Sequence, residues 1–262
     1  MKHLYSLTAI IFALMMHGLV SAETAEEKGL AIVKEADSRD TGWVDQKADL
    51  TMLLKNKQGE ESSRSLLIKT LEVAGDGDKS ITIFGSPKDI KGTAFLSFTH
   101  ALEPDDQWLY LPALKRVKRI SSANKSGPFV GSEFAYEDLT SQEVEKYTYK
   151  WLNDEMLDGR DSFVIENFPA YENSGYTRRI AWVDKEMYQP TKIDFYDRKN
   201  ALLKSLVFTG YKQYLNKYWR PDSMLMINHI TGKSTELTWE NYTFQNGLED
   251  RDFDKNTLKR AR

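Results

Sequence analysis

The sequence PDDQWLYLPALKRVKRI, residues 104–120, is the stretch that decides the fold. It starts as an aromatic strand, turns at a proline and continues as a short segment rich in lysine and arginine. A loop containing glycine and proline follows. The segment GSEFAYEDL, residues 131–139, then reads as an aromatic and acidic helix start. These residues do not have the arrangement of a catalytic centre, and they indicate one wall of an apolar cavity with the lid that covers it.

Residues 1–22 have the pattern of a secretory signal peptide. Lys2 gives a positive start, residues 4–20 are almost wholly apolar, and small residues precede a cleavage point after Ala22. The alternative is an uncleaved N-terminal anchor, for which an apolar run of about 17 residues is short. We expect cleavage in a Gram-negative bacterium, which would leave residues 23–262 as a single lipid-binding domain in the periplasm.

Composition excludes several classes of function. The chain has no cysteine, so disulfides, thiol catalysis and lipid attachment to a cysteine are ruled out. Its formal net charge of −3 argues against nucleic-acid binding. His100 and His229 are far apart and lack a metal-ligand pattern, and there is no nucleophile elbow or phosphate-binding glycine loop. We therefore expect no enzyme activity, no metal and no cofactor.

The rest of the chain predicts a mainly β protein. Residues 23–37 have helical spacing, with acidic residues in the first turn. After residue 43 the period changes to two, and turn residues separate twelve candidate segments, from which we expect a half-barrel of about eleven strands. The segments with this pattern are 48–54, 65–73, 80–84, 93–99, 107–111, 145–152, 162–168, 176–183, 190–197, 202–211, 224–230 and 234–241. So many consecutive hairpins form a long antiparallel sheet that curls or closes.

Several strands are apolar at successive positions, so both faces of the sheet must be covered in places. Two interpretations remain open. The interior is either a filled barrel core or the hollow of a curved sheet, lined with apolar residues and capped by helices. Four tryptophans, Trp151, Trp182, Trp219 and Trp239, either line this hollow or pack in the outer layer.

Lys115, Arg116, Lys118 and Arg119 form the densest basic cluster of the sequence. One interpretation is a solvated edge strand, which lysines protect against mispairing. The other is a contact for an anionic head group or an acidic partner. On a strand, Arg116 and Lys118 share one face while Lys115 and Arg119 share the other, so the pattern does not tell which face is used.

Four segments together resemble the LolA-like family of outer-membrane lipoprotein-sorting proteins. They are SPKDIKGTAFL (86–96), WLYLPALKR (108–116), FVGSEFAYEDL (129–139) and the C-terminal set Asn241, Tyr242, Phe253 and Leu258. The resemblance covers essentially the whole chain after residue 22. Glu133 stands where the family more often has aspartate, a mild departure.

The resemblance implies an unclosed, half antiparallel β-barrel with an N-terminal helix and a helical lid over an apolar cavity. It also implies a periplasmic carrier of lipid or lipoprotein acyl chains that contacts membranes transiently. Some family members are associated with RND-type inner-membrane exporters, which makes such an exporter a candidate partner. Fold kinship alone does not determine the cargo.

We assign seven aromatic residues to the cavity by hypothesis. Phe95, Phe98, Trp108 and Tyr110 would line the sheet, while Phe129, Phe134 and Tyr136 would refill the empty cavity from the lid. The alternative for each is ordinary core packing. Two other functions stay open: a signalling module that senses acylated ligands on the same fold, and a hydrolase of envelope lipid or glycan.

Overall fold

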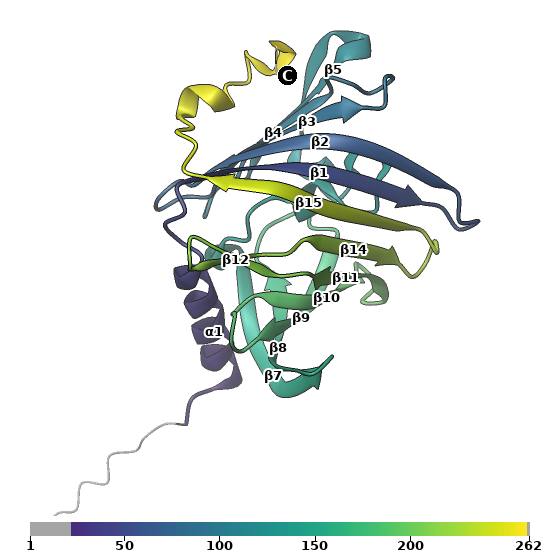
Figure 1. Cartoon of the computed structure of the whole chain (residues 1–262). Helices are drawn as coiled ribbons and strands as arrows, with labels where there is room; N and C mark the ends of the chain where they lie inside the picture. Colours follow the sequence, from purple (N-terminus) through teal and green to yellow (C-terminus); the bar gives the residue numbers. More distant parts are fainter. Residues whose placement is uncertain (1–21, 261–262) are drawn as a thin grey trace, which may run out of the picture.

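The computed structural model describes residues 22–260 of the chain (Figure 1). The predicted signal peptide, apart from its last residue, lies outside the described residues. Between residues 22 and 260, no helix combines the length and the apolar character needed to cross a membrane.

The one α-helix between residues 22 and 260 is α1 (Ala25–Arg39), and the residues at its start determine where it begins. Thr24 accepts a hydrogen bond from the backbone of Glu27, and the Glu27 carboxylate binds the Thr24 backbone in return, so a capping box starts the helix two residues later than predicted. The helix packs closely on strand β7 (Tyr147–Leu157), because a Cβ on Gly29 would lie only 2.7 Å from the backbone nitrogen of Trp151.

Fifteen strands follow in the part of the chain that the structure describes. Their bounds are β1 (Asp45–Lys55), β2 (Glu61–Leu71), β3 (Lys79–Ser86), β4 (Ala94–Phe98), β5 (Asp106–Leu111), β6 (Arg116–Ile120), β7 (Tyr147–Leu157), β8 (Arg160–Pro169), β9 (Tyr176–Asp184), β10 (Pro190–Asp197), β11 (Leu202–Thr209), β12 (Lys212–Tyr214), β13 (Tyr218–Arg220), β14 (Ser223–Asn228) and β15 (Ser234–Phe244). Thirteen of them form one sheet in the order β6-β5-β4-β3-β2-β1-β15-β14-β11-β10-β9-β8-β7, and β12 pairs with β13 in a separate hairpin.

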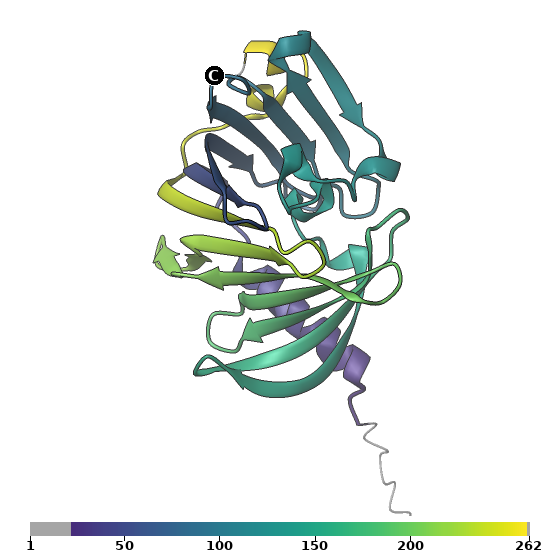
Figure 2. The ribbon, with the colours of Figure 1, turned by 90° about the vertical axis from the view of Figure 1, so that its right-hand side faces the viewer.

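The sheet is strongly curved and open. The strand pairings of the described chain are all antiparallel, and register shifts interrupt several of them, including the pairings of β1 with β15 and of β7 with β8. Such bulges bend a strand and increase its twist. Figure 2 shows the result, in which the half formed by β1–β6 and the half formed by β7–β11 and β14 curve around a common hollow side. The edge strands β6 and β7 are not paired with each other.

The predicted fold class, a mainly β, open half-barrel with an N-terminal helix, is confirmed. The predicted number of about eleven strands is too low. The basic segment forms β6, and β12 and β13 have three residues each, too few for a period of two to be recognised.

The two faces of the sheet carry two separate hydrophobic clusters. The concave cluster is the larger, and it includes Leu50, Leu66, Phe95, Phe129 and many residues of β8–β11. The convex cluster contains residues of β3 and β4 with Phe253 and Leu258 of the C-terminal segment. Both faces are therefore buried in the half formed by β1–β6, as the lost alternation predicted.

The C-terminal segment, residues 245–260, crosses the convex face (Figure 1, yellow). It contains the 3-10 turns η6 (Asp250–Phe253) and η7 (Leu258–Arg260). The Asp45 carboxylate holds its start by accepting hydrogen bonds from Asn246, Gly247 and Leu248. Burial raises the pKa of Asp45, but these hydrogen bonds outweigh that effect and hold the pKa below its usual range.

Candidate functional site

A compact loop, residues 129–139, covers the concave face of the sheet, and we call it the lid. It consists of two 3-10 turns, η3 (Phe129–Gly131) and η4 (Tyr136–Leu139), rather than an α-helix. The Phe129 N–H donates to the Phe134 carbonyl over 2.7 Å, which closes the loop on itself. Val130 has φ +46°, a strained value for a β-branched residue, and Gly131 follows at +79°. Figure 2 shows the lid as teal turns in front of the sheet.

The lid fills the space beneath it with its own aromatic rings. Phe129 and Phe134 are only 1% and 2% exposed. The Phe129 ring centroid lies 5.3 Å from that of Phe95 and 5.9 Å from that of Phe84, and the Tyr136 ring lies 5.4 Å from Phe95. Four of the seven predicted residues, Phe95, Phe129, Phe134 and Tyr136, therefore lie together under the lid. Phe84, which was not among the seven, belongs to the same group.

The other three predicted aromatic residues lie on the opposite face. Phe98, Trp108 and Tyr110 pack in the convex cluster, with 5.2 Å between the Phe98 and Trp108 rings. Strand alternation explains this correction, because Phe95 and Phe98 are an odd number of positions apart and Leu109 is the inward residue of β5. The four tryptophans also divide: Trp151 and Trp239 pack against the concave cluster, whereas Trp182 has the opposite parity to the inward Ala181 and Val183, and Trp219 lies in the β12–β13 hairpin.

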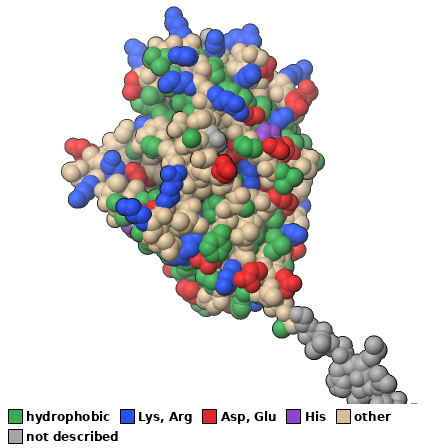
Figure 3. All heavy atoms as spheres, turned by 180° about the vertical axis from the view of Figure 1, so that it is seen from behind, with side chains coloured by type: hydrophobic (Ala, Val, Ile, Leu, Met, Phe, Trp, Pro, Cys, Tyr) green, Lys and Arg blue, Asp and Glu red, His purple; other side chains and the backbone are tan. Residues whose placement is uncertain are grey.

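The basic cluster forms the free edge of the sheet. Arg116, Lys118 and Arg119 lie exposed in β6, and Lys115 precedes them with φ +48°. Arg119 forms an ion pair with Asp106 on β5. Figure 3 shows Lys and Arg side chains gathered at the top of the molecule, where Figure 1 places β5. Both interpretations of this cluster, edge protection and partner contact, are compatible with this position.

A buried polar group that we call the latch holds the lid to the far half of the sheet. It consists of Glu133 and Asp138 of the lid with Tyr176, Lys204 and Asn228 of β9, β11 and β14. Lys204 Nζ lies 2.7 Å from the Asp138 carboxylate, and their side chains are 5% and 3% exposed. Lys204 also donates to the Glu133 carbonyl (2.9 Å), Tyr176 donates to Asp138 (2.8 Å), and Asn228 donates to the Glu133 carboxylate (2.7 Å).

Glu137 adds a second attachment on the same side. Its carboxylate accepts hydrogen bonds from the Gly175 N–H (2.8 Å), the Ser174 hydroxyl (2.9 Å) and the Tyr171 hydroxyl (3.1 Å). Burial raises the pKa of Glu137, and these hydrogen bonds oppose the rise. The sequence pattern predicted that the acidic residues of the lid begin a helix. In the structure, Glu137 instead binds the loop before β9, and Asp138 binds β9 and β11.

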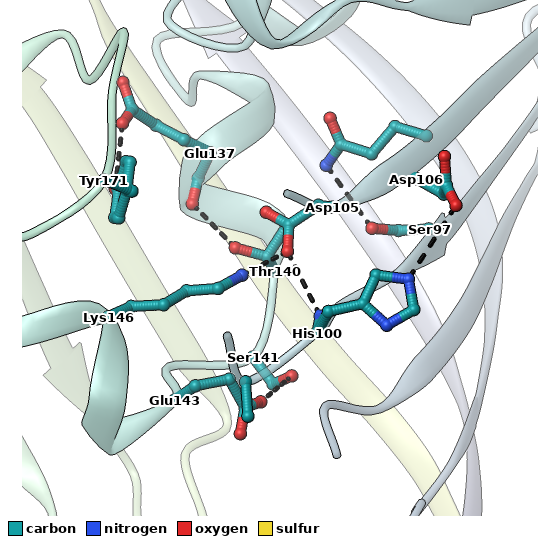
Figure 4. Close-up of polar contacts among 12 residues, drawn as sticks. Ser97, His100, Asp105, Asp106, Glu137, Thr140, Ser141, Glu143, Lys146 and Tyr171 are labelled. Carbon is teal, nitrogen blue, oxygen red and sulfur yellow. Dashed lines mark hydrogen bonds and ion pairs between the residues drawn. The ribbon is translucent and has the colours of Figure 1, made fainter. Parts of the chain in front are cut away.

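Fewer bonds join the lid to the near half of the sheet. Arg64 of β2 donates to the Val130 carbonyl over 2.6 Å, and Gln107 of β5 donates to the Tyr136 carbonyl over 3.2 Å. Figure 4 shows the adjoining polar contacts, where Lys146 pairs with Asp105 and the His100 backbone donates to the same carboxylate. The aromatic side of the lid thus rests on apolar contacts, while its acidic side is hydrogen-bonded.

A cavity of about 500 Å³ lies on the convex face, not under the lid. Its floor includes Leu67 and Ile83, which pair with each other and face away from the concave cluster, and Asp49, Lys91 and Glu240 are among its walls. The space beneath the lid is the one that aromatic rings occupy. In the described chain the concave face is filled with its own side chains, as in the first interpretation, but the sheet around it is curved and open, as in the second.

The fold and site together define a class: a half-barrel whose concave apolar face is covered by a loop that packs its own rings inside. A family model described only as an uncharacterized protein matches residues 76–260. A Vibrio parahaemolyticus domain assigned to outer membrane lipoprotein sorting is 59% identical, with 89% of this chain and 99% of that chain covered and a TM-score of 0.88. The chain therefore belongs to the LolA-like family.

Two further solved structures are similar. A DUF1329 family protein from Desulfovibrio piger is 27% identical, with 90% of this chain and 99% of that chain covered and a TM-score of 0.85. The LolA superfamily protein NE2245 from Nitrosomonas europaea is 21% identical over 90% of this chain and 99% of that chain, with a TM-score of 0.70, and it supports the fold alone. A comparison with curated proteins found no match.

Proposed function

We propose that the protein is a periplasmic carrier that binds the acyl chains of a lipid or lipoprotein and transfers them from inner-membrane machinery to the outer membrane. The observation that carries this proposal is the packing under the lid. Phe129, Phe134 and Tyr136 belong to a loop, not to the sheet, yet they fill the apolar concave face. The 59% identical relative, assigned to lipoprotein sorting, supports the same function.

The energetics of transfer explain why a carrier needs such a lid. Each methylene group moved from a bilayer to water costs about 0.8 kcal/mol, so a chain of about 16 carbons faces roughly 12 kcal/mol. A binding site must recover most of this cost and still release the chain. Rings that return to the site when the chain leaves keep the empty protein stable, because the concave face is then never exposed to water.

The basic edge and the neighbouring loops provide the membrane or partner contact in this proposal. Lys115, Arg116 and Lys118 are exposed, and the exposed Leu114 lies beside them. Lysine and arginine near an anionic bilayer contribute about 1 kcal/mol each. An RND-type exporter as the donor is included in the proposal on the family resemblance alone.

Lipid uptake from vesicles tests the proposal. The buried Phe134 is replaced by aspartate, and Phe168, which is 36% exposed on β8, receives the same change as the matched control. We expect Phe134→Asp to lower uptake of a fluorescent phosphatidylglycerol about tenfold or more, because a carboxylate in the apolar space opposes the acyl chain. Phe168→Asp should leave uptake unchanged.

Folding of each variant is checked by circular dichroism, and Tyr136→Asp, at a half-buried position of the same ring cluster, replaces Phe134→Asp if that variant does not fold. Wild-type uptake by a folded variant would contradict the carrier function. Native mass spectrometry of the protein purified from membranes gives an independent result, since a carrier retains lipid and a protein without this function does not.

A further inference from the structure

The concave face has a polar strip that the acyl-chain proposal does not use. Four polar side chains and one phenylalanine occupy neighbouring strands in matched register. Asn167 on β8 pairs with Arg179 on β9, Arg179 with Phe195 on β10, Phe195 with Lys204 on β11, and Lys204 with Asn228 on β14. Arg179 and Lys204 are two strands apart, so their Cα atoms are about 10 Å from each other. Both lie beside the concave cluster, since Phe195 between them belongs to it.

Arg179 is buried without a hydrogen-bond partner. It is 8% exposed, and its Nε and Nη2 atoms are buried with no partner among the described residues. The Oδ1 atom of the paired Asn167 is unsatisfied as well. The guanidinium lies over the Tyr147 ring at 4.1 Å, a contact that leaves its N–H donors free. A charged group in this state is costly, and the described residues do not supply the partner that would offset the cost.

Lys204 already holds an anion, and that anion comes from the lid. The Asp138 carboxylate lies 2.7 Å from its ammonium group, and Tyr176 donates to the same carboxylate. If the lid moves away, Asp138 leaves with it. Lys204 and Arg179 would then face the hollow together, beside the apolar residues of β1–β5 on which Phe129 packs.

We infer that Arg179 and Lys204 bind the anionic head group of the carried amphiphile, and that Asp138 occupies part of this site while the lid is closed. This inference rests on the proposed function. The phosphate or carboxylate would accept hydrogen bonds from the Arg179 fork and from Lys204, while the acyl chain replaces Phe129 and Phe134 against the apolar half. The ligand anion therefore competes with Asp138 for Lys204, and binding of the head group favours the open lid.

The test compares ligands that share the same acyl chain and differ in their head group. Binding of palmitate, palmitoyl-lysophosphatidic acid and monopalmitoylglycerol is measured on the purified protein by calorimetry. We expect the protein to bind at least one of the anionic ligands about tenfold or more tightly than the neutral glyceride, because hydrogen bonds to charged groups are strong in a buried site. The preferred anion shows whether the head group is a carboxylate or a phosphate.

Three variants assign the preference to residues. Arg179→Met should abolish it and leave the melting temperature unchanged or raised, because it removes an unpaired buried charge. Arg179→Lys should retain part of it. Arg178→Met is the matched control: it removes the same charge from the neighbouring position of β9, whose side chain instead binds Glu166 and Asn200, and should keep the preference.

Asp138→Asn should act in the opposite direction and tighten binding of the anionic ligand, because the competing carboxylate is gone. Equal binding of charged and neutral ligands by the wild-type protein would overturn the head-group site but leave the carrier function intact. The head-group site would also be overturned, with the carrier function intact, if Arg179→Met and Arg178→Met had the same effect on the preference for the anionic ligand. Failure to bind any of the three ligands would overturn the carrier proposal and this inference with it.

Discussion

At the scale of single residues, Asp78 connects stability to pH. Its backbone donates to Ser141 just beyond the lid, and Val73 donates to its carboxylate. Burial raises its pKa to about 7, the Val73 hydrogen bond opposes the rise, and Glu143 adds to it. Because the folded protein holds this proton more tightly than the unfolded chain, the stabilisation present at low pH is lost as the pH rises from about 4 to about 7.

Asp78→Asn should therefore make the protein more stable than the wild type at about pH 8, and the difference should disappear near pH 4. One pKa unit corresponds to about 1.4 kcal/mol, so the gain is expected to be about 2–4 kcal/mol. Urea unfolding across this pH range measures it, with Asp89→Asn at an exposed site as the control. A lower stability of Asp78→Asn at high pH would contradict this account.

At the scale of elements, the lid and the C-terminal segment cover opposite faces of the same strands. Phe129 of the lid and Phe253 of the C-terminal segment are each 1% exposed. Both packings contribute to stability, yet only the lid lies where the acyl chain is proposed to bind. The two elements can therefore be separated by experiment.

Phe129→Ala and Phe253→Ala should each lower the free energy of unfolding by about 3–5 kcal/mol, as truncation of a buried aromatic ring does. Their effects on lipid binding should differ. Phe129→Ala is expected to raise the affinity for lipid, because the ligand has one ring fewer to displace. Phe253→Ala should leave that affinity unchanged. Urea unfolding and vesicle uptake measure the two quantities, and equal effects of both variants on uptake would remove the lid from the mechanism.

The lid also shows how far the sequence could predict the site. Local patterns were sufficient for α1, for most strands and for the aromatic loop of Phe129, Phe134 and Tyr136. They placed Phe98, Trp108 and Tyr110 on the wrong face. Both faces of these strands are covered by hydrophobic clusters, so the sequence does not show which aromatic residues point to the concave side. Lys204 and Asp138 are 66 positions apart, and no local pattern joins them. One sequence pattern could have indicated the buried charge: a charged residue at the same alternation as inward apolar residues of its strand. Arg179 stands in this relation to Ala181 and Val183 on β9.

At the scale of the whole molecule, the loops beside β1–β5 carry opposite charge at the two ends of these strands. The registers place loops 56–60, 87–93, 112–115 and 229–233 at one end. These four loops hold five lysines and two carboxylates, whereas loops 72–78 and 99–105 at the other end hold five carboxylates and no Lys or Arg. The first part of the lid lies at the basic end, since Arg64 and Thr235 near that end bind the backbone of Val130 and Glu133, whereas Gln107 binds the Tyr136 carbonyl toward the other end. This polarity would orient the lid toward an anionic surface.

The double variant Lys115→Glu/Arg116→Glu should slow delivery of lipid to anionic vesicles about tenfold or more at low salt, because each lost cation weakens membrane attraction by about 1 kcal/mol. The difference should shrink as salt screens the charges. The control Lys212→Glu/Lys217→Glu makes the same charge change in the β12–β13 hairpin. If both double variants slow delivery equally, net charge and not the basic end controls it.

The most direct test of the account is to fasten the lid. The Glu133 nitrogen lies 3.0 Å from the Thr235 hydroxyl, so their Cα atoms are at most about 7 Å apart, close enough for a disulfide. The chain has no other cysteine, so Glu133→Cys/Thr235→Cys gives a single reversible link between lid and sheet. We predict that the oxidised protein takes up no lipid from vesicles and that reduction restores uptake. Equal uptake by the oxidised and reduced protein would contradict the claim that lipid enters under a moving lid.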